Sequence, residues 1–121
     1  MDYSQLSDFE INKRVADIVM NGTWHVRPSH PDNATGGWLY GSNGIQTYDL
    51  PDYCNSPEAA WPIIFSNQIS LMYEESIGKW CSGKPYWIDG CEWQLDIDVM
   101  DESPLRAAMI FFLMKQEQAN A

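Results

Sequence analysis

The sequence contains few cysteines and no long apolar run. Its three cysteines have no C-x-x-C spacing, so they form neither a disulfide framework nor a zinc signature, and a reducing cytoplasm is the simplest setting. The longest apolar run, residues 107–114, is far shorter than the ~20 residues of a membrane helix. Because residues 1–10 contain neither a basic region nor an apolar segment, we expect no signal peptide.

Basic residues are also scarce, since seven Lys and Arg stand against 17 Asp and Glu and give a net charge of −10. This balance argues against direct binding to nucleic acid, which requires a basic surface, and against docking on anionic lipid. It is compatible with solubility alone, with a basic partner protein, or with mimicry of nucleic acid.

Motifs of catalysis are missing, since no phosphate-binding loop, nucleophile elbow or H-E-x-x-H pattern occurs. His25 and His30, with Asp32 nearby, are residue types of a metal or general-base site, but their spacing fits no common zinc pattern. Cys54 precedes an expected helix, where a thiol pKa can be lowered, but neighbouring Asp52 opposes this. We therefore expect no catalytic residues, no metal and no cofactor, and we expect that the protein is not an enzyme.

The densest charge cluster consists of Asp96, Asp98, Asp101 and Glu102. It lacks the glycine and the ligand spacing of a calcium loop. We expect Asp96 and Asp98 to point outward from a strand, and Asp101 and Glu102 to precede a helix whose dipole favours anions.

The first of three expected helices spans about residues 7–20. Ser7 and Glu10 form a capping box, and apolar residues recur at helical spacing from Ile11 to Ile18.

A second helix is expected at about 57–67, with Ser56 as N-cap and Pro57 at the first helical position. Pro62 falls inside it and removes one backbone donor, so we expect a kink or restart there. Trp61 would anchor the bend, and three residues would then face the core: Ile63, Ile64 and Phe65.

The third helix is expected at about 104–116, after Ser103 and Pro104. It is apolar nearly all round, so it is either the central helix or part of an interface, and both a monomer and a homodimer remain open.

Four segments alternate like strands: 23–27, 38–50, 70–76 and 84–98. Asn43-Gly44 suits a hairpin turn, and Asp89-Gly90 favours a two-residue type I′ turn. Helices and strands do not alternate singly, so we expect one α+β domain over residues 1–121, with an antiparallel sheet of about four to six short strands and three helices.

Aromatic residues are abundant, with six Trp and six Tyr. Seven of them fall in the expected hairpins, where they either pair across strands over the core or form a binding surface. As the candidate binding surface we take Trp24, Trp38, Tyr40, Tyr48, Tyr86, Trp87 and Trp93.

Three segments together resemble a known family: residues 2–16, 54–71 and 103–118. Their sequences, DYSQLSDFEINKRVA, CNSPEAAWPIIFSNQISL and SPLRAAMIFFLMKQEQ, are similar to the NinX family of small proteins encoded in the nin region of lambdoid bacteriophages. The resemblance implies a phage accessory protein in the cytoplasm of an infected bacterium, and it supplies no catalytic residues.

The resulting hypothesis is a non-enzymatic phage protein that binds and modulates a host protein, such as a bacterial defence factor or a nucleic-acid enzyme. One alternative is a small-molecule binder, such as a sponge for a nucleotide immune signal. Its phosphate contacts would come from four basic residues: Arg27, Lys79, Lys84 and Arg106. A second alternative is an acidic protein that mimics nucleic acid.

Overall fold

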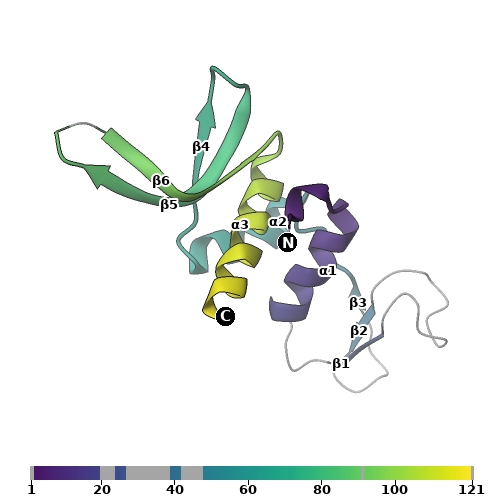
Figure 1. The fold of residues 1–121 in the computed structure, drawn as a ribbon. Helices are drawn as coiled ribbons and strands as arrows, with labels where there is room; N and C mark the ends of the chain where they lie inside the picture. Colours follow the sequence, from purple (N-terminus) through teal and green to yellow (C-terminus); the bar gives the residue numbers. More distant parts are fainter. Residues whose placement is uncertain (1, 20–23, 27–38, 42–47, 91, 121) are drawn as a thin grey trace.

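The structure, a computed structural model, describes residues 2–19, 24–26, 39–41, 48–90 and 92–120 (Figure 1). The described helices are a short 3₁₀ helix η1 and three α-helices: η1 (Tyr3–Gln5), α1 (Asp8–Val19), α2 (Pro57–Ser66) and α3 (Pro104–Ala119). The described strands are β1 (Trp24–Val26), β2 (Leu39–Gly41), β3 (Tyr48–Asp49), β4 (Ser70–Glu74), β5 (Lys79–Ile88) and β6 (Glu92–Asp101). The α+β class with three helices and antiparallel strands is confirmed.

The core is built around α3, which contacts α1, α2 and all three strands β4 to β6 (Figure 1). Ser103 caps this helix by accepting a hydrogen bond from the Arg106 backbone N–H, and Pro104 occupies its first turn. Every residue from Ala107 to Leu113 is buried. The helix therefore needs apolar side chains all round because other elements cover it on all sides.

Of the two hydrogen bonds of the expected capping box, helix α1 has the one that Ser7 accepts and lacks the one that Glu10 would accept. The Ser7 hydroxyl accepts a 3.1 Å hydrogen bond from the Glu10 N–H, whereas the Glu10 carboxylate pairs with Lys13 at 2.9 Å. Ile11 and Val15 are fully buried, so the expected apolar face is the one that contacts α3.

The expected restart of α2 at Pro62 is wrong, because the helix runs without interruption from Pro57 to Ser66. Ile63 and Ile64 are buried as expected, but Phe65 is 71% exposed and Trp61 is 60% exposed. Pro62 and the residue one turn before it, Glu58, both lie on the exposed side. The Glu58 carbonyl that loses its partner therefore remains accessible to water, which reduces the cost of the proline.

The C-terminus of α2 places Gln68 at a positive φ of 54°. The Gln68 N–H donates to the Phe65 carbonyl, and the Ile69 N–H donates to the Ile64 carbonyl. This is the Schellman pattern, in which the left-handed position usually holds glycine.

The six strands form two three-stranded antiparallel sheets, ordered β1-β2-β3 and β4-β5-β6. In the second sheet, the register between β5 and β6 shifts between Ser82 and Lys84. Residues 79–83 of β5 pair with β4, whereas residues 84–88 pair only with β6. Two hairpins therefore diverge from the middle of β5 (Figure 1). We call the β4–β5 hairpin (residues 70–83) the first arm and residues 84–96 the second arm.

Pro85 lies in the second arm, where it has Leu95 of β6 as its only strand partner. Proline has no backbone N–H to donate, and it is tolerated at this position because no β4 strand lies beside it on the other side.

The second hairpin turn is longer than expected. Ile88 pairs with Glu92, so three residues lie between the strands, and among the described residues only Gln68, Gly78 and Gly90 have positive φ. A type I′ turn would require positive φ at Asp89 as well as at Gly90. The hairpin is confirmed and the type I′ turn is wrong.

Candidate binding surfaces

Six of the seven predicted aromatic positions fall on two separate sheets. Trp24, Tyr40 and Tyr48 are backbone positions of the β1–β3 sheet, with Tyr40 opposite Tyr48 in the register. Trp38 lies outside the described residues. The remaining three positions belong to the second arm: Tyr86, Trp87 and Trp93.

The second arm carries two described aromatic side chains, and each is about half exposed. The Tyr86 hydroxyl donates to the Gln94 side chain at 3.2 Å. Trp87 is the next residue along the strand, so it belongs to the opposite face. Trp87 and Trp93 are directly opposite in the register, which is the pairing that the sequence could not decide.

A cleft of about 280 Å³ lies between the two arms. Residues of both arms line it, together with Met100 at the base of β6: Met72, Glu74, Ile77, Cys81, Gln94, Leu95 and Met100. Tyr86 adjoins it through the hydrogen bond to Gln94. Five of its seven lining residues are apolar or sulfur-containing.

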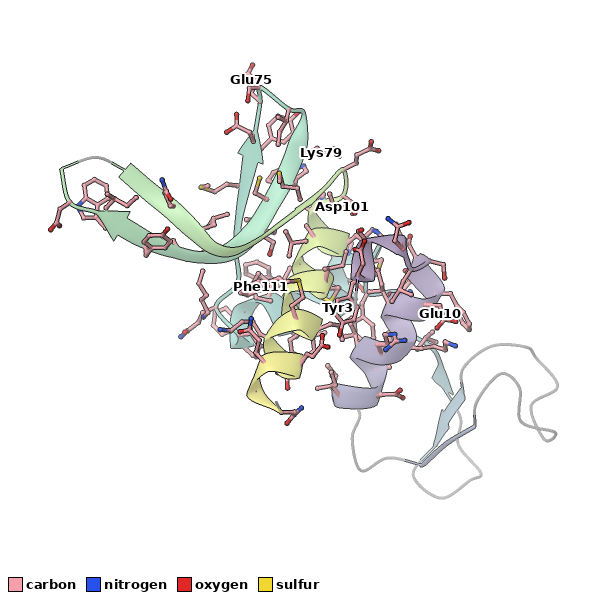
Figure 2. All side chains as sticks on the ribbon, in the orientation of Figure 1. Tyr3, Glu10, Glu75, Lys79, Asp101 and Phe111 are labelled. Atoms are coloured by element: carbon pink, nitrogen blue, oxygen red, sulfur yellow. The ribbon has the colours of Figure 1, made fainter. Side chains whose placement is uncertain are left out.

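The floor of the cleft is one row across three strands. Met72 pairs with Cys81, and Cys81 pairs with Met100. Met72 and Met100 are 45% and 50% exposed, whereas Cys81 between them is only 7% exposed. The neighbouring row, Leu71, Ser82 and Val99, faces α3 and the core. The β4–β6 sheet therefore buries one face and exposes the other. The side chains of the exposed face, which we call the outer face, point into the space between the two arms (Figure 2).

Sequence reasoning missed a second exposed set, on α2. Trp61 and Phe65 are one helical turn apart, and their ring centroids are 6.3 Å apart. The signal was present in the sequence, because Ala60, Ile63 and Ile64 form one helical face and the two aromatics lie on the other.

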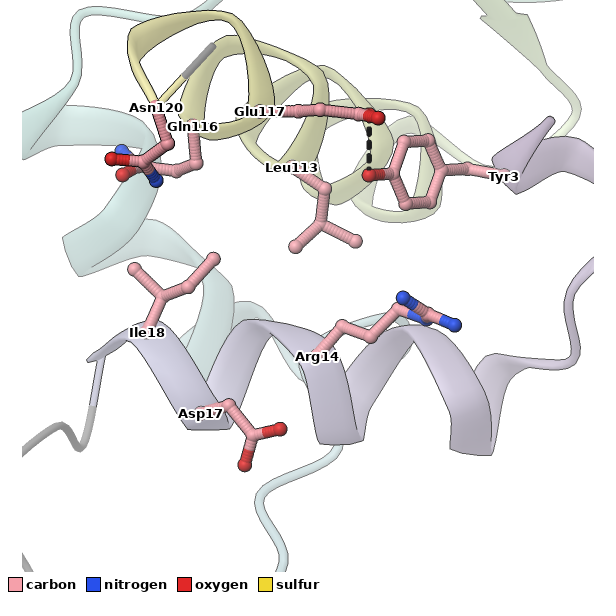
Figure 3. Close-up of a pocket in the computed structure, with 8 residues that line it drawn as sticks. All are labelled: Tyr3, Arg14, Asp17, Ile18, Leu113, Gln116, Glu117 and Asn120. Atoms are coloured by element: carbon pink, nitrogen blue, oxygen red, sulfur yellow. Dashed lines mark hydrogen bonds between the residues drawn. The ribbon is translucent and has the colours of Figure 1, made fainter. Parts of the chain in front are cut away.

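A groove of about 260 Å³ separates α1 from the C-terminal half of α3 (Figure 3). Ile18 and Leu113 point toward each other across it, and the Tyr3 hydroxyl donates to Glu117 at 2.7 Å at one end. Arg14 also lines the groove, and its Nε is buried without a hydrogen-bond partner. Glu117 and Asp17, which line the groove with Arg14, disfavour a free anion there.

Arg106, one of the four suggested phosphate contacts, has structural partners. Its Nε donates to Asp101 at 3.0 Å and its Nη1 to Asp8 at 2.7 Å. Its Nη2 donates to the Ser4 and Leu6 carbonyls. Four of its five N–H donors are therefore engaged, and Arg106 joins the N-terminal segment to the start of α3.

Of the other three suggested phosphate contacts, the two that are described line neither the cleft between the arms nor the groove between α1 and α3. The Lys84 ammonium donates to the Asn67 carbonyl at 3.2 Å, near the end of α2. Lys79 lies at the start of β5, opposite Glu74 in the register. Arg27 lies outside the described residues.

Cys54 is buried, and burial together with the nearby Asp8 carboxylate raises the pKa of its thiol to about 12. The thiolate is therefore negligible at neutral pH, as the expectation of an inert thiol requires. Its backbone N–H donates to the buried Asn12 side chain, which in turn donates to Asp52. These contacts hold the segment before α2 against α1.

The acidic cluster is only partly described. Asp101 accepts hydrogen bonds from the Ser103 backbone N–H and from Arg106, just ahead of α3. Asp96 and Asp98 are described only as backbone positions of β6. Within the described part of the chain, no three His, Cys, Asp or Glu side chains are grouped closely enough to hold a metal ion. His30 lies outside that part, and His25 is a backbone position of β1.

None of the described helices combines the length and the apolar character needed to cross a membrane.

The fold is similar to that of a solved phage protein. A crystal structure described as a phage protein from Bacillus cereus ATCC 14579 matches with a TM-score of 0.60 and 15% identity, covering 93% of this chain and 95% of that chain. At this identity the likeness concerns the fold alone.

The family follows from the sequence match. The family model described as "Bacteriophage P22, NinX" matches residues 2–116, so the chain belongs to the NinX family of bacteriophage proteins. No curated protein matches the chain.

Proposed function

We propose that this phage accessory protein acts in the cytoplasm of the infected bacterium by binding and modulating a host protein, without catalysing a reaction of its own. The observation that carries the proposal is the outer face of the β4–β6 sheet. Half-exposed apolar side chains line a cleft there, and the half-exposed Tyr86 lies beside it. Contiguous exposed apolar surface rimmed by polar residues is typical of protein interaction sites.

The composition of this face supports a protein partner. Methionine and aromatic residues are enriched in interface cores, and methionine adapts to differently shaped partners because its side chain is unbranched and polarizable. On this face, Met72 and Met100 provide methionine at the cleft, and Tyr86 provides an aromatic ring beside it. The buried face of the same sheet packs on α3, so the outer face is available without unfolding the body.

The test is affinity purification of the tagged protein from infected cells of several host strains. The wild-type protein should recover a host protein reproducibly above background. A matched variant, Phe65→Ser, should recover the same protein, because Phe65 lies on α2 and does not line the cleft. Recovery of no host protein in any of the strains would count decisively against the proposal.

A further inference from the structure

We propose that the cleft between the two arms binds an amphipathic segment of its partner that carries large apolar and basic side chains. This inference rests on the proposed function and specifies the chemistry of the partner. It excludes an acidic segment, a lipid surface and a nucleic-acid strand as occupants.

The apolar part of the recognition comes from the floor and walls of the cleft. Met72 and Met100 flank Cys81 across three strands, and Ile77 and Leu95 line the first and second arm. The volume of about 280 Å³ is at the lower limit of the ~300–1,000 Å³ of small-molecule pockets. The cleft therefore suits a few side chains of a larger partner better than a whole cofactor.

The basic part follows from the charge of the sheet. Residues 70–101 contain seven acidic and two basic residues, so this segment has a net charge of −5, half of the −10 of the whole chain. Of the two basic residues, Lys84 is directed to the Asn67 carbonyl, and Lys79 lies opposite Glu74 in the register. Neither lysine lines the cleft.

Glu74 supplies a defined charge on the wall of the cleft. Its carboxylate accepts hydrogen bonds from the Ser76 N–H at 3.1 Å and the Ser76 hydroxyl at 2.8 Å. These hydrogen bonds lower the pKa of Glu74, so it stays ionised at neutral pH. Glu75 follows at the tip of the first arm (Figure 2). An apolar floor with an acidic side chain on one wall is complementary to a basic amphipathic helix.

The probe is a synthetic peptide of about 18 residues, long enough to form a helix, with Leu and Lys at amphipathic spacing. Two counterparts replace either all Lys by Glu or all Leu by Ser. Binding is measured by fluorescence anisotropy of labelled peptide against the full-length protein. We expect the Leu/Lys peptide to bind, the Leu/Glu peptide not to bind, and the Ser/Lys peptide to bind at least about tenfold more weakly, a loss typical of removed apolar anchors.

Three variants locate the site, and urea unfolding confirms that each is folded. Met72→Ser combined with Met100→Ser should weaken Leu/Lys binding at least about tenfold, since it removes two apolar anchors. Glu74→Gln, which is nearly isosteric, should weaken it about threefold at low salt. Phe65→Ser is the matched control and should leave the affinity unchanged.

Several outcomes overturn the inference: no binding of the Leu/Lys peptide, equal affinity for all variants, equal binding of the Leu/Glu peptide, or a loss confined to Phe65→Ser.

In infected cells, the Met72→Ser, Met100→Ser variant separates the two proposals. If it still recovers the host protein, the cleft is not the site and the proposed function stands. If the peptide data hold but the wild type recovers no host protein, the proposed function fails and the chemistry of the cleft stands.

Discussion

In α3, all seven residues from Ala107 to Leu113 are buried, whereas every residue from Met72 to Lys79 in the first arm is exposed. Both stretches contain large apolar side chains, so apolar character alone does not decide where a side chain lies. The difference arises from neighbours, because α3 is enclosed by two helices and a sheet, while the first arm has a second layer on one face at most. The helical body accounts for the stability of the protein, and the arms carry apolar surface that the fold does not need to bury.

The largest expected effect is in the body. Phe111→Ala should lower the free energy of unfolding by about 3–5 kcal/mol, since Phe111 is 1% exposed and its removal leaves a cavity. Phe65→Ala, the same substitution at an exposed position of α2, should change it by less than about 0.5 kcal/mol. Urea unfolding followed by tryptophan fluorescence measures both. Similar losses for the two variants would remove the distinction between body and surface.

The next effect concerns how the body is joined to the sheet. Arg106→Met should lower the free energy of unfolding by about 2–4 kcal/mol, because Asp101 and Asp8 lose charged hydrogen bonds and the Ser4 and Leu6 carbonyls lose their donor. The partial exposure of Asp8 keeps the estimate below that for a fully buried network. Lys84→Met removes a single hydrogen bond and should cost about 1 kcal/mol or less. Equal losses for the Arg106 and Lys84 variants would show that the four hydrogen bonds of Arg106 contribute no more to stability than the single hydrogen bond of Lys84.

Arg106 also illustrates how far the sequence could be read. The serine N-caps of α1, α2 and α3, the approximate spans of the helices and, within the described residues, the strand-rich segments follow from local patterns, and the structure confirms them. The partners of Arg106 lie up to 102 residues away in the sequence, and no local pattern encodes such a contact. The exposure of Phe65 was mispredicted because Pro62 was read as a break instead of as part of the solvent-facing side of a continuous helix.

The candidate surface was predictable only in part. The alternation of aromatic residues pointed to the second arm, where Tyr86 and Trp87 are half exposed. The cleft was not predicted, because it depends on the register of β4, β5 and β6 and on the shift between Ser82 and Lys84. Register is a property of paired strands and cannot be read from either strand alone.

Raising the pH should reduce the free energy of unfolding through a residue of the helical body, the buried Cys54. Burial raises the pKa of Cys54 from 9.0 to about 12, so above pH 9 the unfolded chain releases a proton that the folded chain retains. Stability is therefore unaffected below about pH 9 and falls by up to about 1.4 kcal/mol per pH unit until about pH 12. Burial also raises the pKa values of Tyr3 and Tyr53, which adds to the fall above their ordinary value of 10.0.

The corresponding variant is Cys54→Ala. Between about pH 8 and pH 10, its free energy of unfolding should fall less steeply than that of the wild type, because the contribution of the Cys54 thiol is then absent. Urea titrations at the two pH values give the slopes. Parallel slopes for the two proteins would mean that the Cys54 thiol titrates alike in both states.

A smaller effect is expected where the chain passes from α2 to β4. Gln68→Gly should raise the free energy of unfolding by about 1 kcal/mol, because φ of 54° is strained for a residue with a Cβ and easy for glycine. Gln68→Ala keeps the Cβ and should bring no gain. If both variants were equally stable, the left-handed conformation would not cost the protein free energy.

The smallest effect should be in the first arm itself. Ile77→Ala at the turn of the arm should lower the global free energy of unfolding by less than about 1 kcal/mol, since Ile77 is about half exposed and contributes little burial to the core. The same substitution should make the arm open more often, because local openings depend on the contacts within the arm. Native-state hydrogen exchange distinguishes the two levels: the Trp80 amide should exchange faster in the variant, while the Met109 amide in α3 should exchange almost as in the wild type. Equal acceleration of both amides would show that the arm and α3 unfold together, and that the outer face of the sheet contributes to the same cooperative unit as the body.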